Sequence, residues 1–265
     1  MAYASVVICT MGEPKRVLDC LKEQTFKDFE VIIASERGIV NAMNFALAKV
    51  SGAITVRIDD DVDIPSHWLQ ELLKPFSEPI VGGVTGPTYV PISRRNNRDS
   101  IRIWENPGWF LRWLTGCSKF NPAGIYKCGM VSYDSNYGER FSNHHPQFQP
   151  DHLEGTNWAM RTDLIKIVGG FDKSFDGVSE WFDTDVEQKI KKLGYVLRYN
   201  PKAYLWHLLE FTENYNDRFD GKGRIWNWIR FHYRHSSFHY KKVIFLFVWC
   251  LYFLQKRIQK CFSRL

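Results

Sequence analysis

Three consecutive carboxylates, Asp59, Asp60 and Asp61, follow a short apolar segment and are the residues of this sequence best suited to chemistry. Their mutual repulsion has to be offset by a cation or by exposure to solvent. Side chains alternate along an extended chain, so Asp59 and Asp61 are expected to point to the same side. Oxygen ligands suit a hard cation such as Mg²⁺ or Mn²⁺. The run therefore predicts a cation site, with an acidic loop before a helix cap at Ser66 as the alternative.

Further acids, Asp183 and Asp185, precede apolar residues that recur at helical spacing up to residue 193. Carboxylates in the first turn of a helix interact favourably with its dipole. A helix N-cap is therefore one interpretation of Asp183, and a reactive carboxylate is the other.

The elements that must position these residues alternate between strands and helices. Apolar strands are predicted at residues 4–10, 29–34 and 53–58, and helices around residues 17–21 and 39–49. Nearly continuous apolar strands separated by helices predict a parallel sheet covered on both faces, hence an α/β fold.

Ligands of such open sheets lie beyond the carboxyl ends of the strands. Thr10, Glu36 and residues 59–61 all stand at such ends and are expected to gather at one edge. Arg37 precedes Gly38 at a helix start, where it is expected to meet phosphate or a base, or else to be a solvated surface arginine.

The sequence EGTNWAMR, residues 154–161, contains three candidates for contacts with an acceptor or a sugar. Gly155 lets the backbone approach a ligand closely, and Asn157 and Arg161 carry donors suited to hydroxyls or phosphate. Ordinary loop and strand-end structure is the alternative. The preceding region, residues 86–157, is too long and irregular for a simple connection and is predicted to form acceptor-side structure or a lid.

Composition places these segments in a globular protein. Of its 265 residues, 45% are apolar and 24% are charged, which indicates a sizeable core. The length fits one catalytic domain, residues 1–215, with an appendage at residues 216–265. The six cysteines include no Cys-x-x-Cys pair, so free thiols and a cytoplasmic location are expected.

The appendage is basic and aromatic, with an uninterrupted apolar run at residues 243–254 between pairs of basic residues. As a helix this run extends about 18 Å, well short of the roughly 30 Å hydrocarbon core of a bilayer. A helix lying on the inner face of the cell membrane is the favoured interpretation, and a buried helix or a homodimer contact is the alternative. No nucleic-acid-binding module is recognisable, so nucleic acid is not an expected partner.

Several segments together resemble a family 2 glycosyltransferase of the GT-A fold. They are SVVICT, RGIVNAMN, RIDDDVDIP with WLQELL after it, EGTNWAMR, GGFD and FDTDVEQKIKKLGY, in family order. The resemblance implies a nucleotide-sugar donor, with Thr10 and Glu36 near the base and ribose. It also implies that Asp61 of the Asp-x-Asp (DXD) motif ligates Mn²⁺ or Mg²⁺, with Asp59 and Asp60 alongside.

The same resemblance implies that Asp183 is the catalytic base and that His207 contacts the metal or phosphate. Phe182 stands where the family has a Glu, so Asp185 or Glu180 are alternatives for part of the base's role. A satisfied core or surface histidine is the alternative for His207.

These inferences predict an inverting, metal-dependent glycosyltransferase that acts on a hydroxyl of a lipid-linked or cell-surface glycan, in polysaccharide biosynthesis. Transfer to polyprenyl phosphate and a non-catalytic protein that binds sugar nucleotide or membrane are the alternatives. A nucleotidyltransferase is disfavoured because no phosphate-binding loop rich in Gly and Lys follows the first strand.

Overall fold

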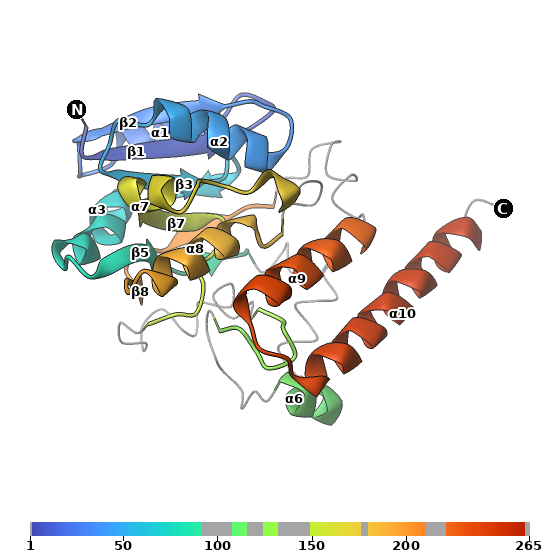
Figure 1. The fold of residues 1–265 in the computed structure, drawn as a ribbon. Coiled ribbons are helices and arrows are strands. Elements are labelled where there is room, and N and C mark those ends of the chain that lie inside the picture. Colours follow the sequence, from blue (N-terminus) through green and yellow to red (C-terminus); the bar gives the residue numbers. More distant parts are fainter. Residues whose placement is uncertain are drawn as a thin grey trace.

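A six-stranded sheet with helices on both faces forms the centre of the structure (Figure 1). The computed structural model describes residues 2–91, 108–115, 124–131, 149–175, 180–209 and 221–262. The strand order is β2-β1-β3-β7-β5-β8, and β7 alone runs antiparallel to its neighbours. The strands are β1 (Ala4–Cys9), β2 (Phe29–Ala34), β3 (Ile54–Ile58), β5 (Val81–Thr85), β7 (Asn157–Arg161) and β8 (Val196–Tyr199).

Two apolar cores lie on opposite faces of this sheet because neighbouring side chains of a strand point to opposite sides. In β1, Val7 belongs to one core while Val6 and Ile8 belong to the other. The predicted α/β class and its mostly parallel sheet are confirmed. The helices beside the sheet are α1 (Lys15–Lys22), α2 (Ile39–Lys49), α3 (Trp68–Leu73), α7 (Thr162–Ile167) and α8 (Phe182–Lys192), with short 3₁₀ turns η1 (Lys74–Ser77) and η4 (Lys173–Phe175).

A second, three-stranded sheet crosses the carboxyl end of β3. It has the order β4-β9-β6 and consists of β4 (Val62–Asp63), β9 (Leu205–His207) and β6 (Thr88–Tyr89). Val62 pairs with His207, and the Leu208 amide donates to the carbonyl of Asp61 at 2.9 Å. This pairing brings the chain around residue 207 beside the acidic run.

Asn157, at the start of β7, joins the small sheet to the large one. Its fully buried side-chain oxygen accepts from Trp68 Nε1 at 2.9 Å. Its Nδ2 donates to the carbonyls of Ala203 at 2.9 Å and Pro87 at 3.2 Å. The amide is thus occupied by protein groups, which does not support the predicted contact with sugar.

The C-terminal helices predicted from the sequence are present as α9 (Gly221–His235) and α10 (Tyr240–Phe262). α9 is part of the protein body, because Trp228 and Phe231 are buried in the same core as α8. α10 has 23 residues and is longer than the apolar run alone, and α6 (Trp109–Thr115) lies beside its start (Figure 1). No described helix is both long and apolar enough to cross a membrane.

The predicted boundary between residues 215 and 216 lies outside the described residues, as does most of the predicted acceptor region at residues 86–157. Both remain predictions.

Replacing Asn157 with Ala is expected to lower the free energy of unfolding by about 3 kcal/mol. The substitution leaves the buried indole N–H of Trp68 and the carbonyls of Pro87 and Ala203 without these hydrogen bonds. Urea denaturation measures the change. Asn41→Ala is the matched control, since Asn41 is exposed and its side chain donates to the carbonyl of Arg37, four residues earlier. Equal stability of the two variants would contradict this role for Asn157.

Candidate metal and catalytic site

Asp59, Asp61 and His207 converge at the carboxyl end of β3. One oxygen or nitrogen atom of each lies within 4.8 Å of the others. His207 Nε2 is 3.1 Å from Asp61 Oδ1 and 3.9 Å from Asp59 Oδ2. Burial lowers the pKa of His207, but the hydrogen bond to Asp61 and the charges of both acids outweigh it and raise the pKa. The structure therefore assembles the residues from which the sequence predicted a metal site.

Asp60 points away from this cluster. Its Oδ2 accepts a hydrogen bond from Thr10 Oγ1, which in turn accepts from the Gly12 amide at 3.0 Å. Burial, together with Asp59 and Asp61, raises the pKa of Asp60 above its ordinary value, although the Thr10 hydroxyl opposes this. Thr10, at the end of β1, is thus joined to Asp60 beside the cluster, where the resemblance implied a nucleotide.

Arg57, two residues before the acidic run, is buried beside the cluster. Its Nη2 is 2.9 Å from Asp59 Oδ1, and its Nη1 is 3.6 Å from Asp183 Oδ2 and donates to the carbonyl of Gly155. The guanidinium therefore links a carboxylate of the cluster to the carboxylate predicted as the base. Arg57 was not among the residues predicted from the sequence, although a charged residue inside the apolar strand ITVRI is an available signal.

Asp183 occupies the second position of α8 and is 7% exposed. It is not the helix N-cap, because Trp181 holds that position and no side chain caps the helix there. Asp183 Oδ1 accepts from the Thr184 amide at 2.9 Å, which leaves Oδ2 directed to Arg57. Burial raises the pKa of Asp183, while Arg57 lowers it less strongly. A raised pKa suits a carboxylate that accepts a proton near neutral pH.

Two further buried groups that the sequence analysis did not identify lie near Asp183. Glu187, one helical turn later, accepts from the Leu153 amide at 3.0 Å, and its other oxygen is buried without a hydrogen-bond partner among the described residues. Burial and the charge of Asp183 raise the pKa of Glu187 well above its ordinary value. His152 interacts electrostatically with Asp183, and its Nε2 is buried and has no hydrogen-bond partner in the part of the chain that the structure describes. The i, i+4 spacing of the two acids in α8 was the available signal for Glu187.

The other acids weighed as the base are bound to α9. Asp185 is fully buried, with His235 Nε2 at 2.7 Å and Lys189 Nζ at 2.7 Å. These contacts lower the pKa of Asp185 despite its burial. Glu180 is 3.1 Å from Arg224. Of the acids considered as the base, Asp183 is therefore the one that faces Arg57.

Glu36 and Arg37 lie beyond the end of β2, next to the first turn of α2. The carboxylates of Glu36, Asp59 and Asp60 all interact electrostatically with the thiol of Cys9. Glu36 therefore faces the same region as the acidic run. One oxygen of Glu36 is buried, and no described residue hydrogen-bonds to it. The side chain of Arg37 is exposed.

Gly155 lies at the site, because a Cβ added there would stand 3.4 Å from Asp183 Oδ2. Arg161 lies at the opposite end of β7, where it pairs with Ile54 at the start of β3. Its guanidinium donates to the carbonyls of Val81 at 2.8 Å and Phe76 at 3.1 Å. This position does not support the predicted contact of Arg161 with sugar or phosphate.

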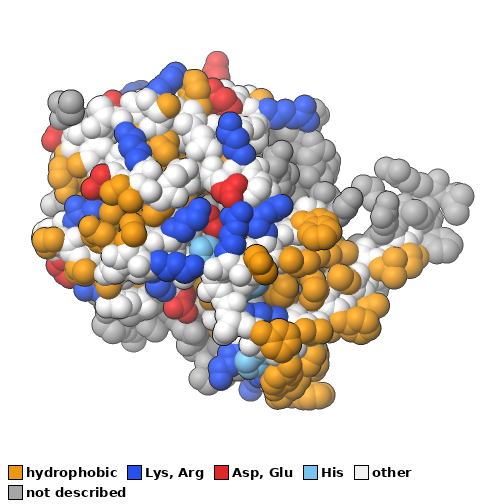
Figure 2. All heavy atoms as spheres, viewed as in Figure 1, with side chains coloured by type: hydrophobic (Ala, Val, Ile, Leu, Met, Phe, Trp, Pro, Cys, Tyr) orange, Lys and Arg blue, Asp and Glu red, His pale blue; other side chains and the backbone are white. Residues whose placement is uncertain are grey.

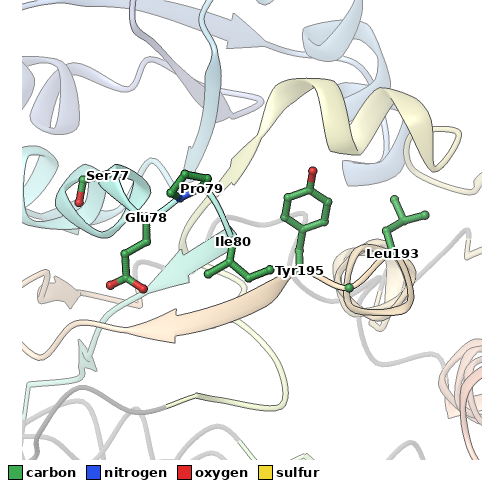
Figure 3. A pocket seen from close by; sticks show the side chains of 7 residues that line it. Ser77, Glu78, Pro79, Ile80, Leu193 and Tyr195 are labelled. Atoms are coloured by element: carbon green, nitrogen blue, oxygen red, sulfur yellow. The ribbon is translucent and has the colours of Figure 1, made fainter.

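A surface hollow lined by residues 77–80 and 193–195 also lies far from the acids (Figure 3). It is at the amino ends of β5 and β8, whereas the acidic run follows the carboxyl end of β3. Its lining is largely apolar, and its carboxylate, Glu78, pairs with Arg198 at 2.9 Å. The hollow therefore does not bring together the ligands that a metal ion needs.

Two carboxylates and one imidazole within reach of a common point fit a divalent cation such as Mn²⁺, which accepts both oxygen and nitrogen ligands. The raised pKa of His207 reflects its hydrogen bond to Asp61 and the charges of Asp59 and Asp61, which would also attract a cation. Asp59, Asp61 and His207 are the residues that would hold the ion.

The amino-acid sequence matches a family model described as glycosyl transferase family 2 over residues 34–169, about half of the chain. The matched region includes the acidic run and Gly155 and ends before Asp183 and His207. No curated protein matches the sequence.

The fold is similar to that of the mannosyltransferase PcManGT from Pyrobaculum calidifontis, solved with GDP-Man and Mn²⁺. The TM-score is 0.55, with 16% identity, over 92% of this chain and 68% of that one. It is also similar to GalNAc-T7 solved with UDP, GalNAc and Mn²⁺, with a TM-score of 0.54 and 13% identity, over 87% of this chain and 47% of that one. These likenesses confirm the predicted GT-A fold.

Asp61→Asn and His207→Ala are each expected to weaken Mn²⁺ binding by about tenfold or more, because each removes a ligand. Isothermal titration of the purified protein with MnCl₂ measures the affinity. Asp63→Asn is the matched control, since Asp63 lies two residues beyond Asp61 and pairs with Arg16 at 3.0 Å. Unchanged Mn²⁺ affinity in the first two variants would show that this cluster is not the metal site.

Proposed function

The chain belongs to glycosyl transferase family 2, and we propose that it transfers a sugar from a nucleoside diphosphate sugar to a hydroxyl of an acceptor, with inversion at the anomeric carbon. The observation that carries the proposal is the position of Asp183. Its buried carboxylate lies across Arg57 from the cluster of Asp59, Asp61 and His207. A candidate base and a candidate diphosphate site therefore adjoin.

The donor is proposed to lie along the carboxyl ends of β1, β2 and β3. Among the described residues nothing hydrogen-bonds to one buried oxygen of Glu36, which is suited to accept from a ribose or base, and the hydrogen-bonded pair of Thr10 and Asp60 lies at the end of the neighbouring strand β1. Arg37 is exposed near the start of α2, where its guanidinium is suited to donate hydrogen bonds to a phosphate or to the base. When bound at the cluster, Mn²⁺ or Mg²⁺ would neutralise the diphosphate and stabilise it as a leaving group.

In the proposed reaction, Asp183 takes the proton of the acceptor hydroxyl. The oxygen forms a bond to the anomeric carbon as the bond from that carbon to the diphosphate oxygen breaks. The electron pair leaves with the nucleoside diphosphate, and the configuration inverts because attack is from the opposite side. Arg57 holds the carboxylate of Asp183 in place, and Gly155 leaves room beside it.

A hydroxyl on a lipid-linked or cell-surface glycan is the proposed acceptor, which places the enzyme in polysaccharide biosynthesis. Transfer to polyprenyl phosphate is the rival reaction, but that nucleophile is already anionic and needs no base. The buried, directed carboxylate of Asp183 favours the hydroxyl. A protein that only binds sugar nucleotides would show saturable binding without turnover.

Asp183→Asn is expected to lower kcat at least a hundredfold while leaving the affinity for the donor nearly unchanged, because it removes the proton acceptor and not the diphosphate site. Labelled UDP-, GDP- and dTDP-sugars, each with Mn²⁺, identify the donor through transfer or slow hydrolysis, and the best donor is then used for the variant.

Asp163→Asn is the matched control for this substitution. Asp163 is also the second residue of its helix and also accepts from the next amide, that of Leu164 at 2.8 Å, but it is exposed on α7. Full activity is expected for this variant. Retention of most activity by Asp183→Asn would instead support transfer to an anionic acceptor.

The activity is expected to fall as the pH drops through the raised pKa of Asp183, because the base acts only when ionised. Arg57 lowers this pKa, so Arg57→Gln should raise it further and move the acidic limb of the kcat/KM profile upward by about one pH unit. Arg16→Gln, which removes an exposed arginine paired with Asp63, should leave the limb in place. A limb that stays fixed in Arg57→Gln would refute this coupling.

A further inference from the structure

The outward face of α10 is an apolar stripe. Five side chains recur at spacings of three or four residues and lie on one side of the helix. They are Val243, Phe247, Leu251, Leu254 and Ile258, each between 47% and 65% exposed. A helix on the surface of a soluble domain normally carries polar residues on this side.

The inward face of α10 is apolar as well and holds the helix against the protein. Phe245 is buried, with its ring 5.8 Å from that of Trp228 on α9, and Trp249 is 5.2 Å from Phe245. These contacts fix which side of α10 faces outward. The outer stripe therefore runs along the surface.

α6 extends the stripe at the start of α10. Lys241 donates to the carbonyl of Trp113 and lies over the Trp113 ring, 4.9 Å from its centroid. The rings of Trp113 and Tyr240 are 6.4 Å apart. Trp109 and Trp113 are 80% and 42% exposed. Figure 2 shows the hydrophobic side chains gathered along α10 and α6 into one region.

The charges of these helices favour one kind of partner. Between residues 221 and 262 the chain has no Asp or Glu, and the charged residues of α10 are all Lys or Arg. A second copy packed on this stripe would bring two such basic helices together without acids to offset them. Anionic lipid headgroups complement basic side chains while the acyl region accepts the apolar ones.

We propose that the outer stripe of α10, together with α6, docks the protein on the surface of an anionic lipid bilayer, with α10 lying parallel to it. The aromatic rings of α6 match the preference of Trp for the interface between headgroups and acyl chains. Anionic headgroups would balance the basic residues that α10 carries towards both of its ends.

The docking surface is connected to the candidate base. α10 packs on α9, and the ring of Phe231 on α9 packs on that of Trp181, with centroids 4.5 Å apart. Trp181 precedes Asp183 by two residues. Provided that the proposed function is correct, this arrangement holds the site close to a membrane and favours an acceptor carried on a lipid. The docking itself needs no catalysis.

Co-sedimentation with vesicles tests the docking. The full chain, without donor sugar, is mixed with vesicles of phosphatidylcholine alone or with about one third phosphatidylglycerol. Binding to the anionic vesicles is expected, with weaker binding at high salt. The double substitution of Phe247→Glu and Leu251→Glu should weaken that binding at least about tenfold.

The double substitution of Ile80→Glu and Ile167→Glu is the matched control, because it adds the same charge at exposed apolar positions outside α6 and α10. It should bind vesicles like the original protein. Circular dichroism and the Mn²⁺ affinity of the stripe variant verify that its fold and site are intact.

Failure of the original protein to bind anionic vesicles, or equal binding by both double variants, would overturn the proposal. So would light scattering that shows a dimer disrupted only by the stripe substitutions, since the stripe would then be a subunit interface. These results are separate from sugar transfer, because none of them depends on turnover.

Discussion

The guanidinium of Arg57 lies buried between the carboxylates of Asp59 and Asp183 and beside the carbonyl of Gly155. Removing ionised carboxylates from water costs several kcal/mol each unless a counter-charge and hydrogen bonds replace the solvent. A planar guanidinium can do this for two acids at once. Strand β3 therefore supplies the acids at its end and also the cation that keeps one of them next to α8. The proposed base and the proposed metal site depend on this one side chain.

Much of this arrangement was predictable because it follows from local periodicity. Alternation along the chain that follows β3 predicted that Asp59 and Asp61 share one side, and Asp60 is turned towards Thr10 instead. The ends of apolar strands in an α/β sheet indicated where these side chains would meet. The pairing of β4 with β9, which brings His207 to the acids, joins segments far apart in the chain and is not encoded in any local pattern.

Other roles depend on neighbours that a sequence does not reveal. Asn157 and Arg161 carry donors suited to a ligand, yet backbone carbonyls from distant segments occupy them. Asp183 and Asp185 are two positions apart on α8, so they point in different directions, one to Arg57 and the other to His235. The direction of each side chain is set by β3 and α9, which pack around the helix and supply the two partners.

Trp181 has a left-handed backbone conformation, with φ of 78°, at the point where α8 begins. For a residue other than glycine this conformation costs about 1–3 kcal/mol and persists only when surrounding packing enforces it. Phe231 of α9 supplies that packing, and α9 is synthesised after every strand of the main sheet. During translation the sheet and the acidic run can therefore form first, whereas the entrance to α8 is completed only after residues 221–235 have emerged from the ribosome. A nascent chain would hold the proposed donor site before it could hold the proposed base in position.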